Sequence, residues 1–552
     1  MNKRLFGFSL SAILLFASCE KENNDEISGP EVQETFEVET SQSTLSNFLS
    51  FDNSGVVSIS SVDDTRNQAI NNLIAIEQIA EIEPPYLEGE ILRATDVDFQ
   101  NNFVYVAYTK EDDAYLGAMD IIDISDEHNP ILVTRVLSPF ADINAISIDG
   151  NQLYFTGAYF ANEENPDRAF IAQATVNNGN FQKDNVAIKM NMTGYAGVEI
   201  MKTDNSLIAL TGSNGVFGEY AINGNNEFTT LSETSISDLR SAAYNQNKLA
   251  LLSGDEGVKI FSQTGDKFEL VNSFATSTLT PESKRKIAWF QDDLIVPEGA
   301  EGARIYNMNS SSPIKTLPIH SIAANDGIDE EDKATIAVSV IEDYIFTANG
   351  GAGLGVIQLS NDTEIIAQGI AEIDGSSNYV GSKGDYVFVA SGEGLKILKL
   401  SKPKNNTGVS EYFSMCSDYP AYNGNPNLNV NSNEEKAYSG SASLNHLNIN
   451  AKLTFCGSLN VKHGVNINSN AKFNMSGSLA IGRMNKREDL NINSNSVLRI
   501  NGSVVIYSDL NLNSGSTIEF VGEDSSIHIY GNVRKGNNVT IKGTYNDTSN
   551  KL

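Results

Sequence analysis

A repeated pattern of short apolar segments, with a period of about forty to fifty residues between Asp96 and Leu400, constrains the fold most strongly. Each unit contains a turn rich in Asp, Asn or Gly, an apolar strand, a second turn and another alternating strand. The second strands are expected at 103–106, 153–156, 207–210, 249–252, 294–296, 344–347 and 386–389. Several short strands per period are typical of propeller blades. We therefore predict an all-β chain with a seven-bladed β-propeller over residues 86–402.

Glycine-rich turns separate the second and third strands of several units. They lie at 254–257, 299–302, 350–353 and 392–394. Glycine suits these positions because a tight hairpin turn needs positive φ angles. A phosphate-binding loop would have to lead into the N-terminus of a helix. These turns join strand to strand, so we interpret them as hairpins.

The two ends of the propeller sequence indicate how the ring closes. A propeller with an unpaired first or last blade would leave exposed strand edges. Residues 88–92 precede the first blade, and the seventh blade stops after Leu400 without an outer strand. We expect residues 90–92 to pair with the seventh blade. Before them, apolar residues at helical spacing between Arg66 and Ile82 predict one amphipathic helix within 61–85.

The composition changes after Leu400. Residues 403–427 are interpreted as a linker, and residues 428–552 are rich in Asn and Ser. Three short strand types recur there in coils of about 18 to 20 residues, which is typical of a parallel β-helix. Alternate apolar residues would fill the core, while Asn would occupy the corners and form ladders from coil to coil. The insertion at 483–489 lengthens one coil.

The N-terminus has the pattern of an export signal. A basic start is followed by an apolar run at 5–17, which is too short to span a bilayer, so residues 1–18 are expected to be a signal peptide. The sequence Phe-Ala-Ser-Cys at 16–19 resembles the bacterial lipobox, which implies lipid attachment to Cys19. Residues 20–26 resemble the acidic signal of Bacteroidetes surface lipoproteins. This resemblance implies a lipid anchor in the outer membrane with the chain exposed at the cell surface, the periplasmic face being the alternative. Residues 19–60 would form an acidic flexible tether.

The first repeat unit resembles a known family. Residues 119–125 (Met-Asp-Ile-Ile-Asp-Ile-Ser) and 129–133 (Asn-Pro-Ile-Leu-Val) are similar to the LVIVD repeat of bacterial surface β-propellers. In that family a strand ends in an Asp-hydrophobic-Ser turn and continues through Asn-Pro into the next strand. Only the first unit matches well; the others keep the spacing of the strands but not the residues of the repeat. The resemblance implies the fold more than an activity.

Two cysteines remain after Cys19. If the mature chain is outside the cytoplasm, Cys416 and Cys456 are free to form a disulfide bond. The loop that it closes would stabilise the entry end of the β-helix by about 3–4 kcal/mol in the chain-entropy model. The alternative is two separate buried thiols.

The charge of the chain limits its partners. Its formal net charge is −32, which argues against nucleic-acid binding, because phosphate recognition needs a basic face. An acidic surface suits solubility, cations or a basic partner. Acidic loops supply the candidate contact residues Asp112, Asp113, Asp326, Asp329 and Asp332. Calcium is conceivable there, although the spacing does not follow an EF-hand and a solvated loop is the alternative. His446 and His463 are one coil apart, but no third metal ligand is evident.

No catalytic motif emerges from the sequence. It contains no Walker loop, zinc-protease helix, nucleophile elbow or CxxC, so we assign no catalytic residue, cofactor or metal. We expect a non-catalytic cell-surface lipoprotein that acts as a binding or scaffold module, recognising a glycan or an envelope protein through the propeller loops. The first alternative is a polysaccharide hydrolase or lyase with its site in the propeller. The second is adhesion or self-association through the β-helix.

Overall fold

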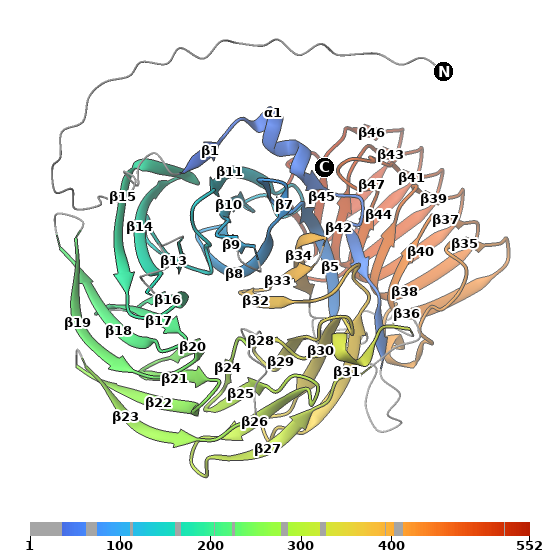
Figure 1. Cartoon of the computed structure of the whole chain (residues 1–552). Helices are drawn as coiled ribbons and strands as arrows, with labels where there is room; N and C mark the ends of the chain where they lie inside the picture. The colour runs from blue at the N-terminus through green and yellow to red at the C-terminus, as the bar shows by residue number, and fades with distance from the viewer. Residues whose placement is uncertain are drawn as a thin grey trace, which may run out of the picture.

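The structure is a computed structural model that describes residues 36–61, 74–110, 114–159, 167–203, 205–223, 227–265, 267–277, 285–320, 327–391, 393–401, 412–523 and 525–552. It is nearly all-β, with a seven-bladed propeller beside a parallel β-solenoid of about six turns (Figure 1). Both predicted architectures are therefore confirmed. No helix in these ranges is long and apolar enough to cross a membrane.

Each blade is an antiparallel sheet whose strands follow one another in sequence, with the first strand innermost. The strands of blades 1 to 4 are β8 (Arg93–Gln100), β9 (Phe103–Thr109), β10 (Gly117–Asp123) and β11 (Ile131–Ser138); β12 (Ala145–Asp149), β13 (Gln152–Ala158), β14 (Ala169–Asn177) and β15 (Asn180–Met192); β16 (Ala196–Lys202), β17 (Leu207–Gly212), β18 (Val216–Ile222) and β19 (Phe228–Ser235); β20 (Leu239–Asn245), β21 (Lys248–Ser253), β22 (Gly257–Thr264) and β23 (Lys267–Phe274).

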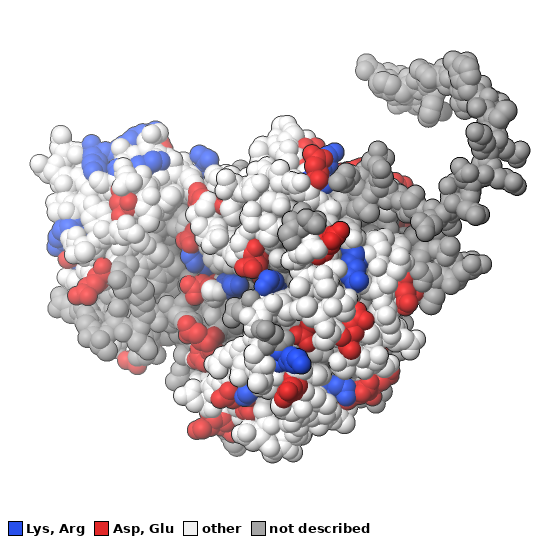
Figure 2. Space-filling model, turned by 90° about the vertical axis from the view of Figure 1, so that its left-hand side faces the viewer, with Lys and Arg blue, Asp and Glu red and all other residues white. Residues whose placement is uncertain are grey.

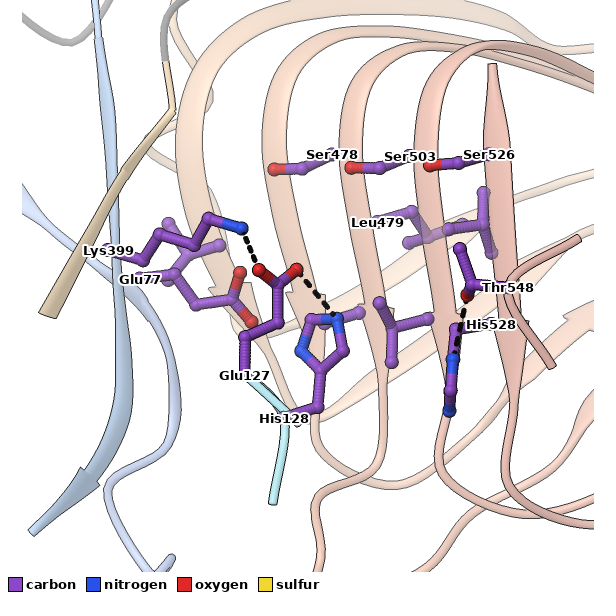
Figure 3. A pocket seen from close by; sticks show the side chains of 14 residues that line it. Glu77, Glu127, His128, Lys399, Ser478, Leu479, Ser503, Ser526, His528 and Thr548 are labelled. Atoms are coloured by element: carbon purple, nitrogen blue, oxygen red, sulfur yellow. Dashed lines mark hydrogen bonds and ion pairs between the residues drawn. The ribbon is translucent and has the colours of Figure 1, made fainter. Parts of the chain in front are cut away.

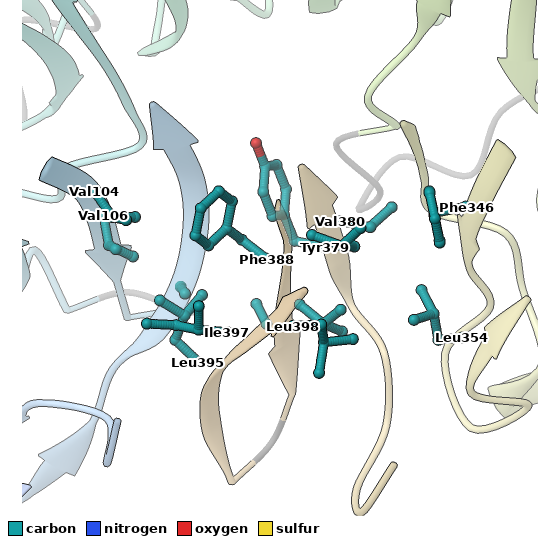
Figure 4. Packing of buried hydrophobic residues seen from close by; sticks show 14 of the residues in the cluster. Val104, Val106, Phe346, Leu354, Tyr379, Val380, Phe388, Leu395, Ile397 and Leu398 are labelled. Carbon is teal, nitrogen blue, oxygen red and sulfur yellow. The ribbon is translucent and has the colours of Figure 1, made fainter. Parts of the chain in front are cut away.

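Blades 5 to 7 complete the ring. Their strands are β24 (Ala288–Phe290), β25 (Asp293–Pro297), β26 (Ala303–Asn307) and β27 (Ser312–Leu317); β28 (Ala337–Ile341), β29 (Tyr344–Ala348), β30 (Leu354–Leu359) and β31 (Ile365–Ala371); β32 (Tyr379–Lys383), β33 (Tyr386–Ser391) and β34 (Gly394–Ser401). Apolar side chains fill the seams between neighbouring blades. At the closure, Phe346 of blade 6, Phe388 of blade 7 and Val104 of blade 1 belong to one buried cluster (Figure 4).

The ring closes with a different segment from the one we predicted. The fourth strand of blade 7 is β5 (Ala75–Ile82), which pairs antiparallel with β34 from Ile82 opposite Leu395 to Ala75 opposite Ser401. Residues 90 and 91 instead form a hairpin of β6 (Tyr86–Leu87) and β7 (Glu90–Ile91). The expected closure by residues 90–92 is therefore wrong in its residues, although an N-terminal strand does close the ring.

The helix predicted within 61–85 is also wrong where the structure describes it. Residues 75–82 are strand β5, and residues 62–73 lie outside the described part. The pairing of β5 with β34 skips Ile79, which makes a bulge between Gln78 and Ala80. A bulge shifts the phase of the inward-facing residues by one position. As a result Ile76, Ile79 and Ala80 are all buried at a spacing that resembles one face of a helix.

Residues 36–61 lie on the propeller and do not form the free tether that we expected over 19–60. They form β1 (Glu37–Glu39), α1 (Gln42–Leu45), the 3-10 turn η2 (Ser46–Phe48), β2 (Leu49–Ser50), β3 (Gly55–Val57) and β4 (Ile59–Ser61). β1 pairs with β11 of blade 1, β4 with β31 of blade 6, and β2 and β3 with β5 of blade 7. This segment therefore covers the outer edges of three neighbouring blades, which protects them from edge-to-edge pairing.

The solenoid has two parallel sheets. One contains β35 (Asn427–Val430), β37 (His446–Ile449), β39 (Val465–Ile467), β41 (Leu490–Ile492), β43 (Leu510–Leu512) and β46 (Val533–Lys535); the other contains β36 (Glu435–Leu444), β38 (Lys452–Val461), β40 (Lys472–Ile481) and β42 (Val497–Ile506), followed by β44 (Thr517–Phe520), β45 (Ser526–Ile529), β47 (Thr540–Lys542) and β48 (Asn546–Asp547). We expected three strand types throughout. In β38, β40 and β42 the second and third types form one long strand, which a glycine divides near its middle.

Asparagine ladders run along the solenoid, as the sequence predicts. The amide of Asn466 donates to Asn448 at 3.2 Å, and Asn491 donates to Asn466 at 3.0 Å. A second row follows the corner, where Asn468 donates to Asn450 at 2.8 Å. Asparagines at another corner adopt positive φ angles, for example 64° at Asn470 and 57° at Asn495. The Asn-rich composition thus satisfies polar groups between coils and allows the chain to turn.

The predicted disulfide bond between Cys416 and Cys456 is present, with the two Cα atoms 5.6 Å apart. It joins the turn η6 (Cys416–Asp418), in the segment interpreted as a linker, to β38 of the solenoid. The solenoid in turn contacts the propeller. The guanidinium of Arg483, in the inserted loop, donates to the carbonyl of Asp52 at 2.7 Å. Gly55 lies so close to Asn460 that a Cβ atom would be 2.2 Å from the amide nitrogen.

Candidate ligand-binding site

A cavity with a volume of about 860 Å³ opens at the centre of the propeller. It lies at the face on which the innermost strands begin, which we call the entry face. The side chains that line it come from the starts of these strands and the loops beside them, and they include Arg93, Asp96, Lys110, Asp142, Asn144, Glu199, Arg240, Ser241, Lys286, Glu331, Asp332, Asn378 and Tyr379. The cavity is therefore polar and contains charges of both signs.

β-Bulges precede three of the lining residues. In β8 the pairing skips Thr95 before Asp96, in β16 it skips Val198 before Glu199, and in β20 it skips Arg240 before Ser241. A bulge redirects the side chains that follow it. The innermost strands are thus built so that polar residues at equivalent positions line the channel.

A buried ionic network occupies the inner part of the cavity. The Nζ atom of Lys286 lies 2.7 Å from Oε2 of Glu199 and 3.3 Å from Oδ1 of Asp96. The hydroxyl of Tyr379 donates to the same Oδ1 atom at 2.8 Å. The backbone amide of Ile146 donates to the other oxygen of Asp96 at 3.0 Å. Every member of this network has partners, which a charged group needs away from water.

The pKa values in this network follow from burial and from the charges. Burial raises the pKa of Glu199, although Lys286 opposes the shift. For Lys286, burial alone would lower the pKa, but the carboxylates of Asp96 and Glu199 outweigh it and hold the pKa well above its usual range. Lys286 is therefore charged at neutral pH. Because Lys286 contacts both Asp96 and Glu199, neither carboxyl group is free to act as a general acid or base.

The acidic loop predicted at 326–332 borders this cavity. Glu331 and Asp332 line it, in the 3-10 turn η5 (Glu330–Asp332), while Asp329 directly precedes the turn. Asp326 lies outside the described residues, as do Asp112 and Asp113. Lys110, the last described residue before the latter pair, lines the same cavity. Glu331 and Asp332, in the second predicted acidic loop, and Lys110, just before the first one, therefore line the same opening.

Three of the four cations that line the cavity are paired with acidic groups in the described structure. Lys110 lies 3.3 Å from a carboxylate oxygen of Glu90, and Arg240 lies 2.7 Å from Asp238. Lys286 is paired inside the channel. In the part of the chain that the structure describes, Glu331 and Asp332 make no ion pair. Five acidic and four basic side chains line the cavity, so the mouth has a small excess of negative charge.

A second, smaller cavity of about 200 Å³ lies where the propeller meets the solenoid (Figure 3). Glu127 lies between Lys399, with which it forms an ion pair, and His128, whose Nε2 atom is 3.4 Å from Glu127. Burial raises the pKa of Glu77 to about 7 and lowers the pKa of His128 to about 4. His528 of the solenoid faces His128, with the ring centroids 5.9 Å apart. These residues join the two domains and do not border the propeller channel.

The remaining sequence candidates lie elsewhere. His446 and His463 are on successive coils, as expected, with ring centroids 5.1 Å apart. Among the described residues, no group of three or more His, Cys, Asp or Glu side chains is placed to hold a metal ion. Cys19 lies outside the described residues.

Four residues of the buried ionic network were not predicted from the sequence: Asp96, Glu199, Lys286 and Tyr379. The available signal was a polar or charged residue at the start of an otherwise apolar innermost strand, as in Ala-Thr-Asp-Val at 94–97 and Gly-Val-Glu-Ile at 197–200. Strand alternation alone could not select them, because the bulges change which residues face the channel.

Three segments of the chain match the LVIVD repeat. They are residues 93–138, 334–371 and 374–412, which correspond to blades 1, 6 and 7. Our expectation that only the first unit matches well was therefore too narrow. The three blades are also those whose outer edges receive strands from the N-terminal segment.

Comparison with other proteins gives the following matches. No curated protein matches the chain. Among solved structures, the WD40 repeats of RRP9 are 9% identical, with 62% of this chain and 100% of that one covered and a TM-score of 0.43. The WD40 β-propeller domain of Doa1 is 12% identical, with 59% and 98% covered and a TM-score of 0.39. YCF48 bound to D1 peptide is 13% identical, with 64% and 100% covered and a TM-score of 0.41.

Proposed function

We propose that this chain is a non-catalytic binding module that holds a positively charged group of a partner protein at the mouth of the propeller channel. The observation that carries the proposal is the position of Glu331 and Asp332, which line the cavity while Lys110, Arg240 and Lys286 have acidic partners. A propeller with LVIVD repeats fits a binding or scaffold role. Loops held on a rigid ring are common places for such contacts.

The arrangement favours binding over hydrolysis of a polysaccharide. A glycosidase needs two carboxyl groups on either side of the scissile bond, with space for substrate or water between them. Asp96 and Glu199 do face one another in the channel, but the ammonium group of Lys286 contacts both. This cation occupies the space that a substrate would need. It also forms ion pairs with both carboxyl groups.

The described interior of the cavity offers a sugar no free aromatic platform. Among the described residues that line the cavity, Tyr379 is the only aromatic one, and its hydroxyl is bonded to Asp96. Sugar-binding subsites commonly use aromatic faces as platforms. Acidic and basic side chains are interspersed on the face drawn in Figure 2, which gives no support for binding to nucleic acid. A protein of the cell envelope that presents Lys or Arg is the partner that we propose.

The solenoid is less suited to self-association. The last coil carries Arg534, Lys535 and Lys542 on its short strands. Charged residues on an edge disfavour pairing with another edge. We therefore assign the solenoid a scaffold role beside the propeller.

We further propose that the protein is anchored in the outer membrane by lipid on Cys19, with the chain at the cell surface. The support is the lipobox-like sequence at 16–19 and the acidic segment after it. The bond between Cys416 and Cys456 agrees with an oxidising compartment. Metabolic labelling with palmitate would test the anchor, with Cys19→Ala as the unlabelled control. Protease digestion of whole cells would separate the surface from the periplasmic face.

A displayed library of random peptides provides the probe for the binding function. We expect the mature protein to enrich peptides that contain Lys or Arg and to bind them more weakly as salt increases. Glu331→Gln with Asp332→Asn should weaken this binding about tenfold or more, which corresponds to the loss of about 1.4 kcal/mol. Glu269→Gln, on the exposed outer strand of blade 4, is the control. Enrichment of the same peptides by the double variant, or release of product from a polysaccharide panel, would refute the proposal.

A further inference from the structure

Large apolar side chains are exposed around part of the channel mouth. Tyr86 and Ile91 are 66% and 56% exposed, and Phe140 and Tyr195 are each 47% exposed. All four lie in the connections that lead into the innermost strands of blades 1, 2 and 3, at the entry face. We call these four residues, three aromatic and one isoleucine, the aromatic rim. Exposed apolar groups gathered beside a polar cavity commonly mark an interaction site.

The first half of the rim is a small hairpin beside the cavity. Tyr86 and Ile91 lie opposite each other on β6 and β7. Glu90, next to Ile91, forms the ion pair with Lys110, and Lys110 lines the cavity. Arg93, two residues after Ile91, lines it as well. The hairpin is thus fixed to the edge of the mouth.

The second half of the rim is held by hydrogen bonds and a cation. The hydroxyl groups of Tyr115 and Tyr195 are 2.8 Å apart, and the guanidinium of Arg168 lies 5.5 Å and 5.3 Å from the centres of their rings. Leu116, which follows Tyr115, donates its amide to Asp142, a residue of the cavity wall. Phe140 is two residues before Asp142. Aromatic side chains fixed in this way lose little conformational freedom when they bind a partner.

The cavity wall next to the rim also contains an unused polar group. Thr109 lines the cavity and is 6% exposed. Its hydroxyl has no hydrogen-bond partner among the described residues. Buried hydroxyls are nearly always bonded in folded proteins, so a lone one points to a missing partner. Thr109 lies directly before Lys110 and opposite Arg93, both of which line the cavity.

We propose that the aromatic rim and the acidic mouth form one docking surface for a polypeptide segment in which a Lys or Arg residue is flanked by apolar residues. This inference rests on the proposed function and specifies the partner. The basic side chain enters the mouth toward Glu331 and Asp332. The neighbouring apolar side chains pack on Tyr86, Ile91, Phe140 and Tyr195.

The chemistry of the two regions selects this class of partner. A metal ion or a small amine would need the carboxylates but would not contact the rim. Interfaces between proteins combine an apolar anchor with charged pairs at its edge, and a few aromatic residues supply most of the binding energy. The described contacts of the solenoid with the propeller, at Asp126, Lys399 and Asp52, involve none of the residues that line the mouth.

The peptide library separates this inference from the proposed function. We expect the enriched peptides to carry an aromatic or aliphatic residue within a few positions of Lys or Arg. Tyr86→Ser with Ile91→Ser should weaken the binding of such a peptide about tenfold or more, without changing its salt dependence. Leu231→Ser with Leu270→Ser, which removes exposed apolar groups from the outer strands of blades 3 and 4, should leave binding unchanged.

Each outcome decides one point. If peptides without apolar residues bind equally well, or the Tyr86 and Ile91 variant loses less than about twofold, the rim has no role and the inference is overturned while the acidic mouth stands. If Glu331→Gln with Asp332→Asn has no effect, the proposed function fails, and the joint surface fails with it. All four substituted rim and control positions are exposed, and an unchanged melting temperature confirms that each variant is folded.

Discussion

The hydroxyl group of Tyr530, in the solenoid, lies 3.0 Å and 3.1 Å from the two carboxylate oxygens of Asp126, in the propeller. Asp126 follows β10 in the turn where blade 1 resembles the LVIVD repeat. The neighbouring His128 packs edge-on against Tyr507 of the solenoid. The turn that identifies the repeat in sequence therefore also attaches the second domain.

Removal of this contact tests how strongly the domains are joined. Tyr530→Phe keeps the stacking of the ring on Tyr507, with centroids 5.2 Å apart, and removes only the hydroxyl. Because Asp126 loses the hydrogen bond from Tyr530 at a partly buried interface and keeps only the one from the amide of His128, we expect the free energy of unfolding to fall by about 1–2 kcal/mol. Urea denaturation measures the change. Tyr422→Phe, whose hydroxyl bonds an exposed carbonyl, is the control, and an equal loss in both variants would contradict the assignment.

The cavity between the domains makes a specific prediction about pH. The pKa of Glu77 is raised to about 7, so its contribution to stability is complete below the unfolded value of 4.5 and is lost as the pH rises through 7. The pKa of His128 is lowered to about 4, so its contribution is complete above 6.5 and is lost as the pH falls through 4. Between about pH 4.5 and 6.5 the two slopes oppose each other.

Single substitutions should reveal how each of the two groups makes the stability depend on pH. Glu77→Gln should leave a protein whose melting temperature falls as the pH drops from 6.5 to 4. His128→Gln should give the reverse, with stability falling as the pH rises from 4.5 to 7. Each change is at most about 3.4 kcal/mol, the free energy that corresponds to pKa values of about 7 for Glu77 and about 4 for His128. Calorimetry of the two variants across this range is the measurement. Parallel pH profiles in both variants would show that the two groups do not act in this way.

Stacked glycines divide the long strands of the solenoid. Gly477 has a φ of +117°, and a Cβ atom there would lie 2.0 Å from the carbonyl oxygen of Gly457 on the coil before. Gly477→Ala should therefore destabilise the solenoid by several times the φ penalty, which alone is about 1 kcal/mol. Gly384→Ala is the matched control, because its φ is also positive at +58° but no atom lies within 4 Å of the added Cβ. Equal losses would mean that the close contact relaxes freely.

The disulfide bond should stabilise the entry end of the solenoid. Cys416→Ser with Cys456→Ser removes a link between positions 40 residues apart. We expect a loss of about 3–4 kcal/mol, because the unfolded chain regains the entropy of the open loop. Hydrogen exchange of β36 and β38 would localise the effect. Reduction of the unaltered protein should reproduce it, and protection factors that stay the same in both experiments would contradict the role.

Much of the architecture could be predicted because a repeated sequence pattern shows the length and order of the strands in each unit. The second strands at 153–156 and 344–347 fall within β13 and β29, and the pattern Leu-Asn-Ile at 490–492 is strand β41. The channel site could not be predicted in the same way. Asp96 and Lys286 are 190 positions apart, and their contact depends on the ring bringing blades 1 and 5 together. The strand β5 was mistaken for a helix because the bulge at Ile79 interrupts its alternation.

The pairing of β5 with β34 sets an order of events in folding. Ile82 meets Leu395 only after the seven blades between them exist, so closure is a late step with high contact order. Until then the outer edge of blade 7 and the covered edges of blades 1 and 6 are open to other chains. A nascent or truncated chain that ends before β34 would lack the strand pairing that closes the ring. Such species should be the principal source of aggregation when this protein is overproduced.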